Sequence, residues 1–273
     1  MRRIIFFLLA GLVLLVSCKK SIPEPSAPSP TPSAVITPTE TPLPTPSPSP
    51  SANNLSVEES YVRDSYDHAD GQRLCTLNVA MPKIVGDSDA AAVVTDYYQS
   101  ADLMLLSMWD EYVAEAHDRY ESSKTSGNLF MPVNIEGNFS VEGYTDQFLS
   151  VKRELHIYSG GAHAGTTLYT DTFDLTTGRA LSLLDFFTVA PDELQRRLLP
   201  YVTDAIQKHP DDYFENYETL ARDLFPYNAY TLNENTLTLI YPEYSLAAFT
   251  QGTLSFSIPL ADLQDITNKD YLR

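Results

Sequence analysis

Apolar residues of this chain follow two spacings, one typical of a helix and one of strands. Between about residues 87 and 122 they recur at intervals of three and four, which predicts a long helix with one buried face. Asp87 or Ser88 can cap its start, and the helix is expected to run to about Ser122. The apolar stripe, which we interpret as core and not as a ligand surface, consists of Val94, Tyr98, Ala101, Leu105, Trp109 and Tyr112.

Alternation of apolar and polar residues predicts strands before and after this helix. The predicted strands are 73–84, 129–141, 146–158, 165–175, 236–241 and 252–259. Turns at Gly143-Tyr144 and Ser159-Gly160-Gly161 separate the second, third and fourth of them, which indicates an antiparallel meander. Thr176-Thr177-Gly178-Arg179 predicts a further turn.

Two shorter helices are predicted in the last third of the chain. One covers 191–208, where Pro200 should kink the helix or restart it, and the other covers 212–224. The expected class is α+β, with an antiparallel sheet and packed helices. A helix-bearing N-terminal subdomain is expected over 55–145 and a sheet–helix subdomain over 146–273.

The first residues have the pattern of an export signal. Met1-Arg2-Arg3 is basic, and the thirteen residues Ile4 to Val16 are almost all apolar. Such a run suits a signal-peptide core and is short for a membrane-spanning helix. Leu15-Val16-Ser17-Cys18 resembles a bacterial lipobox, whose cysteine is lipidated. We expect a lipoprotein signal peptide over 1–17 and an extracytoplasmic chain anchored to the bacterial membrane through Cys18. A plain secretory signal and an uncleaved helix are the alternatives.

Proline, serine and threonine dominate the stretch that follows. Residues 21–54 contain 11 prolines among 34 residues, a composition that favours polyproline II and cannot build a core. At about 3.1 Å per residue the stretch reaches roughly 100 Å. We interpret residues 18–54 as the lipidated cysteine and a semi-rigid tether. A ligand for a proline-binding domain is the alternative.

Composition narrows the function classes. The chain has 36 acidic and 18 basic residues, a net charge of −18, and loss of 1–17 with its two arginines makes this −20. Such a charge disfavours nucleic-acid binding, which depends on Lys and Arg. Of the two cysteines only Cys75 would remain free, so no internal disulfide is expected. We interpret Cys75 as a buried strand residue, the alternative being a reactive thiol.

Catalytic and metal-binding patterns are not recognisable in the sequence. The five histidines, which form no known zinc motif, are His68, His117, His156, His163 and His209. His156 and His163 flank a predicted turn that would bring them together, but two ligands do not make a metal site. Ser159 near His163 lacks the third group of a triad. We expect no metal, no cofactor and no catalytic residue. Acidic pairs such as Asp110-Glu111 are interpreted as solvated surface, although glycosidases use paired carboxylates.

Three segments, taken in order, resemble one family. They are Tyr158–His163, Phe173–Phe187 (Phe-Asp-Leu-Thr-Thr-Gly-Arg-Ala-Leu-Ser-Leu-Leu-Asp-Phe-Phe) and Tyr241–Gly252, the last followed by Ile258-Pro259-Leu260-Ala261-Asp262-Leu263. Together they are similar to the extracytoplasmic domain of RsiV-type anti-sigma factors, which bind lysozyme. The same module accompanies the catalytic domain of PdaC-type peptidoglycan deacetylases. The resemblance covers about 70–270.

The resemblance implies a binding module, with two departures. This chain has Ala164-Gly165 where the family usually has proline. A lipobox also replaces the cytoplasmic segment and membrane helix of the anti-sigma members, and the deacetylase domain does not follow before Arg273. We therefore expect a stand-alone lipoprotein without anti-sigma activity. Candidate ligand-binding residues, on the turn and on the loop of the first and third segments, are Ser159, Gly160, Gly161, His163, Glu243 and Tyr244.

Three functions are compatible with this sequence. The first is a non-catalytic surface lipoprotein that binds lysozyme, peptidoglycan or another wall-associated ligand. Its negative charge would attract a basic protein such as lysozyme and would repel anionic wall polymers. The second is a wall-glycan enzyme that uses surface carboxylates. The third is a structural envelope lipoprotein.

Overall fold

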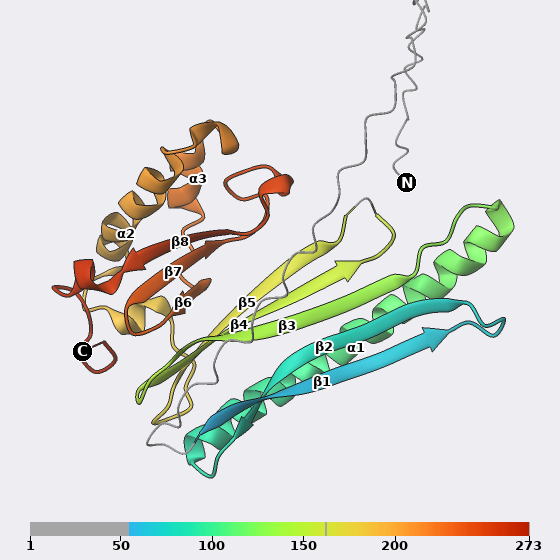
Figure 1. The fold of residues 1–273 in the computed structure, drawn as a ribbon, viewed down its shortest axis with the longest axis horizontal. Helices are drawn as coiled ribbons and strands as arrows, with labels where there is room; N and C mark the ends of the chain where they lie inside the picture. Colours follow the sequence, from blue (N-terminus) through green and yellow to red (C-terminus); the bar gives the residue numbers. More distant parts are fainter. Residues whose placement is uncertain (1–54, 162, 273) are drawn as a thin grey trace, which may run out of the picture. The chain divides into compact units, whose positions relative to one another are not determined.

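The computed structural model describes residues 55–161 and 163–272 (Figure 1). The chain divides into residues 1–46 and residues 47–273, and every described residue belongs to the second unit. The predicted signal peptide over 1–17, the lipidation site Cys18 and the tether over 21–54 lie outside the described residues. Among the described helices, none combines the length and the apolar character that a membrane span requires.

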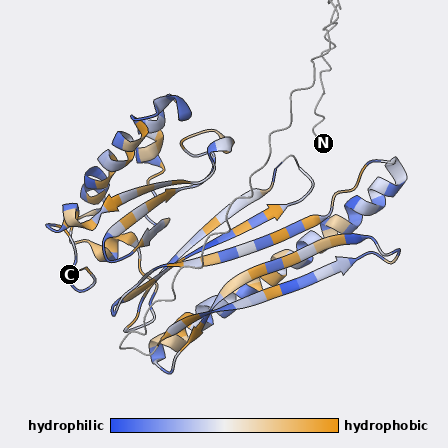
Figure 2. Ribbon diagram, in the orientation of Figure 1, coloured by the Kyte–Doolittle hydropathy of each residue, from blue (hydrophilic) through white to orange (hydrophobic). Residues whose placement is uncertain are grey.

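A five-stranded sheet and one long helix form the first part of the described chain. The elements are β1 (Ser56–Asp67), β2 (Arg73–Val85), α1 (Asp89–Ser126), β3 (Val133–Tyr144), β4 (Phe148–Tyr158) and β5 (Gly165–Asp174). The strands lie in chain order in the sheet, and α1 packs across it (Figure 1). Hydrophobic and hydrophilic positions both occur along β2 to β5 (Figure 2). The α+β class is confirmed.

The long helix begins and ends at local signals. The Ser88 hydroxyl accepts a hydrogen bond from the Ala91 N–H at 3.1 Å, which caps the first turn. Gly127 closes the helix with a left-handed φ of 73°, so that α1 ends at Ser126 and not at Ser122. The predicted stripe does pack toward the sheet, since its buried members are Val94, Tyr98, Leu105 and Trp109.

One strand pair corrects the expectation of an antiparallel sheet. β2 and β3 pair in parallel, in register from Cys75 opposite Val133 to Val79 opposite Gly137. The other neighbours in this sheet are antiparallel, as predicted for β3, β4 and β5. The parallel pair arises because α1 carries the chain back to the starting end of β2 before β3 begins, which is a crossover connection.

The sequence pattern did not predict two of the strands, β1 and β6. β1 contains no buried residue and has polar residues at most positions, so no apolar alternation marks it. As an edge strand it is held by its hydrogen bonds to β2. β6 (Tyr230–Leu232) has only three residues, too few for a periodic pattern.

The second part of the described chain has its own sheet and core. Its elements are α2 (Pro191–Ile206), α3 (Tyr217–Asp223), β6, β7 (Thr236–Tyr241) and β8 (Leu254–Pro259), with short 3₁₀ turns at Leu183–Phe186, Pro210–Asp212, Phe249–Gln251 and Leu260–Leu263. The strands form an antiparallel sheet in the order β6-β7-β8. The core of this part includes Leu194, Leu198 and Val202 of α2 against Leu237 and Ile258.

Pro200 does not restart the second helix. α2 runs without interruption from Pro191 to Ile206, although proline removes one backbone donor. Leu198 and Val202, on either side of Pro200, are fully buried, and the Thr203 hydroxyl donates to the Pro200 carbonyl at 3.2 Å. Tertiary packing therefore holds the helix together across the proline.

The two sheets meet through hydrogen bonds to hydroxyl groups. The Ser150 hydroxyl of β4 is fully buried and accepts a hydrogen bond from the Leu232 N–H of β6 at 3.2 Å. The Thr170 hydroxyl of β5 accepts from the Tyr230 N–H at 3.2 Å. The boundary predicted between residues 145 and 146 falls in the turn between β3 and β4, two paired strands of one sheet.

Candidate functional site

An open groove brings together the two segments that carry the candidate ligand-binding residues. Ser159 and His163, from the β4–β5 turn, face Glu243 and Tyr244, from the β7–β8 loop, across a volume of about 530 Å³. We call it the turn–loop groove. Its other lining residues are Tyr112, Ile157, Gly165, Thr166, Thr167, Pro242 and Phe249. The binding role of these residues stays a prediction.

The β7–β8 loop is anchored at its base and exposed at its tip. Leu246 and Ala247 are buried, and the Phe214 N–H donates to the Leu246 carbonyl at 2.9 Å. Tyr244 is 67 % exposed and has a φ of 63°. Among the described residues it is the only non-glycine with positive φ, a conformation that side chains disfavour and that is often kept at functional positions. Its ring packs edge-on against Phe214 at 5.7 Å.

The β4–β5 turn supplies the opposite wall. Gly160 has a φ of 91°, and a Cβ at that position would lie 2.3 Å from an Arg119 guanidinium nitrogen, so that the arginine side chain would have to move. This position in the turn therefore favours glycine, and neither Gly160 nor Gly161 is among the residues that line the groove. The His163 ring lies 5.6 Å from the ring of Phe249, so that turn and loop contact each other directly. Phe249 was not singled out as a site residue from the sequence.

The chemistry of the groove suits recognition through hydroxyls and rings. Ser159, Thr166 and Thr167 supply hydroxyl groups, and the Thr166 hydroxyl lies 3.1 Å from His156 Nδ1. Among its described lining residues, Glu243 is the one carboxylate. Acid–base hydrolysis of a glycoside in this groove would need a second, facing carboxyl group.

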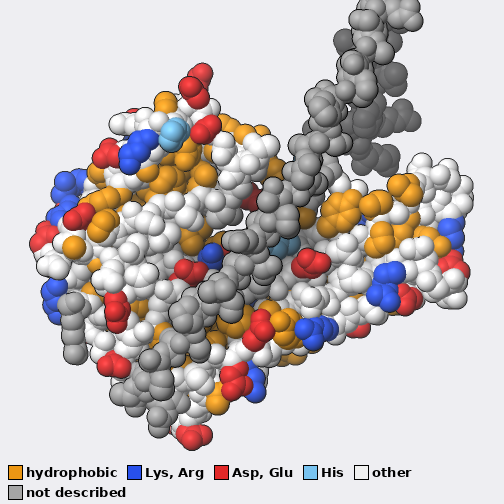
Figure 3. Space-filling view, viewed as in Figure 1, with side chains coloured by type: hydrophobic (Ala, Val, Ile, Leu, Met, Phe, Trp, Pro, Cys, Tyr) orange, Lys and Arg blue, Asp and Glu red, His pale blue; other side chains and the backbone are white. Residues whose placement is uncertain are grey.

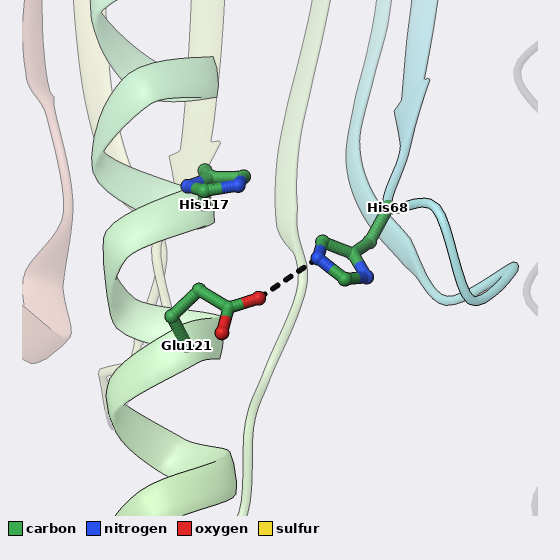
Figure 4. Close-up of side chains that lie close together, drawn as sticks. All are labelled: His68, His117 and Glu121. Carbon is green, nitrogen blue, oxygen red and sulfur yellow. Dashed lines mark ion pairs between the residues drawn. The ribbon is translucent and has the colours of Figure 1, made fainter.

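His156 and His163, which flank the β4–β5 turn, do not contact each other, whereas two other histidines do come close together. His156 contacts Thr166, whereas His163 packs on Phe249. The metal-ligating atoms that cluster are instead those of His68, His117 and Glu121, on other elements (Figure 4). Sequence reasoning missed this cluster because His68 lies in the β1–β2 turn and is far along the chain from the helix residues.

A second cavity, of about 370 Å³, lies between α1 and the larger sheet. Its apolar lining comes from Val79, Met81, Ala101, Met104, Leu105, Met108 and Leu155. Arg153 also lines it and pairs with buried Asp171 at 2.7 Å. The Tyr97 hydroxyl donates to the same carboxylate at 2.6 Å, and burial together with this charge raises the pKa of Tyr97 to about 12. The cavity is thus mainly apolar, and its charged lining residues are Arg153 and Glu154.

A family model matches the second part of the chain, which carries the loop of the groove. Residues 185–261 match the family model of DUF3298, described as a protein of unknown function. The DUF3298 match includes α2, α3 and the β7–β8 loop, while the turn at Ser159–His163 precedes it. No curated protein matches the chain.

Solved structures extend the likeness over most of the chain. A crystal structure of a DUF3298 family member from Bacteroides fragilis has a TM-score of 0.62 and 17% identity, covering 81% of this chain and 96% of that one. A DUF3298 family protein from Pseudomonas aeruginosa has a TM-score of 0.54, also at 17% identity, covering 80% of this chain and 96% of its own. At this identity the likeness shows a shared fold alone.

Proposed function

We propose that this chain is a non-catalytic binding protein of the bacterial cell envelope, and that it recognises lysozyme or another wall-associated ligand through the turn–loop groove. The observation that carries the proposal is the meeting of Ser159 and His163 with Glu243 and Tyr244 around one open groove. These are the segments for which the resemblance to RsiV-type domains implies a binding face. That this chain is related to RsiV-type domains is itself part of what we propose.

The exposed aromatic rings of the groove support recognition of a macromolecule. Tyr244 is 67 % exposed and Phe249 is 38 % exposed, which leaves both rings available to a partner. Tyrosine is enriched among residues that dominate binding energies, because it offers a large contact area and a polar tip at small entropic cost. Tyr244 lies at the exposed tip of the loop with a left-handed backbone, and its ring packs on Phe214 at 5.7 Å.

The charge of the protein supports a basic partner. Residues 55–272 contain 34 acidic and 13 basic residues, a net charge of −21. On the face in Figure 3, acidic and basic side chains are scattered and do not gather in one patch. Attraction of a basic protein would therefore act over the whole molecule and would raise the association rate, while contacts in the groove would determine specificity.

The proposed location rests on the N-terminal pattern. Lipidation at Cys18 would hold the chain at the outer side of the membrane, with residues 21–54 as the tether. Expression of the full chain in a bacterium fed a labelled fatty acid tests this. We expect label in the wild type and none in Cys18→Ser. Equal labelling of both proteins would contradict the anchor.

A calorimetric titration with hen-type lysozyme tests the proposed function. The titrated chain covers residues 55–273, which contain both sheets and their cores. We expect submicromolar affinity at low salt and weaker affinity at about 0.3 M salt, where screening shortens the range of charge attraction. A muramidase assay would then show inhibition. If the folded protein gives no heat at either salt concentration, lysozyme is excluded and peptidoglycan fragments become the ligands to titrate.

A further inference from the structure

Three potential metal ligands converge where the β1–β2 turn meets α1. His68 follows directly after β1, while His117 and Glu121 lie one helical turn apart on α1 (Figure 4). His68 Nε2 is 2.8 Å from Glu121 Oε1, and the rings of His68 and His117 are 5.7 Å apart. One ligand atom from each of the three residues lies within 4.8 Å of those of the other two.

Both nitrogens of His68 have partners. His68 Nδ1 lies 3.0 Å from Asp70 Oδ1 and 3.3 Å from the Asp70 backbone nitrogen, whose N–H donates to it, while Nε2 faces Glu121. Asp70 is held in turn by the Gln72 N–H, at 3.1 Å from Oδ1, and by the Tyr120 hydroxyl, at 3.0 Å from Oδ2. With its proton on Nδ1 and donated to the Asp70 carboxylate, His68 would have Nε2 free to bind a metal, which is the arrangement that metal-binding histidines commonly adopt.

We propose that His68, His117 and Glu121 form a binding site for a divalent transition-metal ion of the Zn²⁺ class. Two imidazoles and one carboxylate are a donor set that Zn²⁺ accepts in tetrahedral sites, whereas Ca²⁺ and Mg²⁺ prefer oxygen donors alone. The His117 and Glu121 side chains are 42 % and 45 % exposed, so an ion can enter and water can supply the fourth ligand. Bound metal would clamp the β1–β2 turn onto α1.

Lys124 is the competitor for this site. Its ammonium lies 2.5 Å from Glu121 Oε1 and 3.9 Å from Asp70 Oδ2. A metal ion therefore displaces the ammonium from Oε1 or binds through Oε2. Without metal, the same residues would form an ion-pair network between turn and helix, and the experiment has to separate these two roles.

Titration of the full chain with zinc, after removal of metal by a chelator, distinguishes a metal site from an ion-pair network. We expect one Zn²⁺ per chain, and a binding constant at least tenfold weaker in His117→Ala and in Glu121→Gln. Asp70→Asn should weaken binding by about tenfold, because it removes the carboxylate that orients His68. His209→Ala and Glu115→Gln, at exposed positions outside the cluster, are the matched controls and should bind as the wild type does.

A cobalt spectrum keeps the test independent of the variants' folding. Co²⁺ bound in place of Zn²⁺ should give the visible absorption of a tetrahedral nitrogen–oxygen site in the wild type, and His117→Ala should abolish it. Thermal unfolding of the metal-free variants checks their fold. No zinc binding, or stoichiometric binding that His117→Ala and Glu121→Gln leave unchanged, would overturn the proposal. Either result would leave the turn–loop groove untouched, since these residues do not line it.

Discussion

The buried carboxylate of Asp171 is stabilised by Arg153 and by two tyrosine hydroxyls. Among the described ion pairs theirs is the most buried, with side chains 11 % and 5 % exposed. Arg153 donates to both carboxylate oxygens of Asp171, at 2.7 and 3.4 Å, and the hydroxyls of Tyr97 and Tyr98 also point to that carboxylate. Removal of the arginine would leave an incompletely compensated carboxylate under α1.

Arg153→Ala is therefore expected to destabilise the fold by about 3 kcal/mol, in the range for the loss of one partner of a buried pair. Arg196→Ala is the matched control. Arg196 pairs with Glu193 on the surface of α2, at 70 % exposure, so its loss should change stability by about 1 kcal/mol or less. Urea unfolding of both variants provides the comparison. Similar losses would contradict the assignment of Arg153–Asp171 as a structural pair.

Asp185 makes stability depend on pH. Burial alone would raise its pKa, but hydrogen bonds from Arg179 and Ser182 outweigh burial and lower the pKa below the ordinary 3.8. A carboxyl group with a lowered folded-state pKa stabilises the fold above its unfolded-state pKa, and this stabilisation is lost as the pH falls through the folded-state value. The pKa of Asp174 is lowered in the same direction, since hydrogen bonds from Tyr271 and the Thr177 and Thr176 N–H groups outweigh burial.

We expect the free energy of unfolding to fall as the pH drops from about 5 toward 2. Asp185→Asn should be less stable at pH 7 by about 1 kcal/mol, because it weakens the turn before α2, and should lose less stability on acidification. Unfolding by urea at several pH values measures both quantities. A variant with the wild-type loss on acidification would show that Asp185 does not contribute to it.

At the scale of helices and strands, the sequence predicted those elements whose ends and buried face are determined by nearby residues. The long helix carries both its caps and its apolar stripe, so Ser88 and Trp109 take the positions predicted for them. β1 has no buried residue, and its pairing with β2 depends on backbone hydrogen bonds that no residue pattern reveals. The parallel pairing of β2 with β3 was likewise missed, because it depends on where the chain returns after α1. Cys75 is buried in β2, as interpreted, and burial raises the pKa of its thiol to about 11.

The candidate site was predictable only in pieces. The resemblance marked Ser159–His163 and Glu243–Tyr244, and the structure brings both segments to one groove. Phe249 was missed because one aromatic residue in a loop has no sequence signal of its own. The cluster of His68, His117 and Glu121 was missed because its two helix residues alone do not make a metal site. The third residue, His68, is distant in sequence and comes close to them only in the folded chain.

Gly127 and Gly178 allow the cost of a left-handed backbone to be distinguished from the cost of a steric clash. Gly127 and Gly178 both have left-handed backbones, with φ of 73° and 75°. A side chain at Gly127 would enter open space, whereas one at Gly178 would lie 2.6 Å from Val93 Cβ and 2.7 Å from the Ala90 carbonyl in the first turn of α1. The turn after β5 thus packs against the start of the helix.

Gly127→Ala should destabilise by about 1 kcal/mol, the cost of a left-handed alanine. Gly178→Ala should destabilise by about 1–3 kcal/mol more, because α1 or the turn must shift to relieve the collision. Chemical denaturation of the two variants gives the difference directly. Equal losses would mean that the turn and helix are not in contact as described.

At the scale of the whole molecule, two packed parts create a groove that neither forms alone. The turn that supplies His163 belongs to the five-stranded sheet, and the loop that supplies Tyr244 belongs to the DUF3298 match. Buried contacts such as Ser150 to Leu232 fix the two sheets against each other. The position of Gly143 reinforces this, since an added side chain would meet the Leu232 carbonyl at 2.0 Å. The groove is therefore preformed, which reduces the entropic cost of binding.

Titration of Tyr244→Ala with lysozyme tests the central claim, that the groove binds, most directly. Tyr61→Ala is the matched control, because Tyr61 is 45 % exposed on β1 and does not line the groove. If wild-type protein binds, Tyr244→Ala should weaken the affinity by about thirtyfold, equivalent to about 2 kcal/mol for a dominant interface residue, and Tyr61→Ala should bind as the wild type does. Unchanged affinity in Tyr244→Ala, with the variant folded, would place binding elsewhere on the protein and contradict the account.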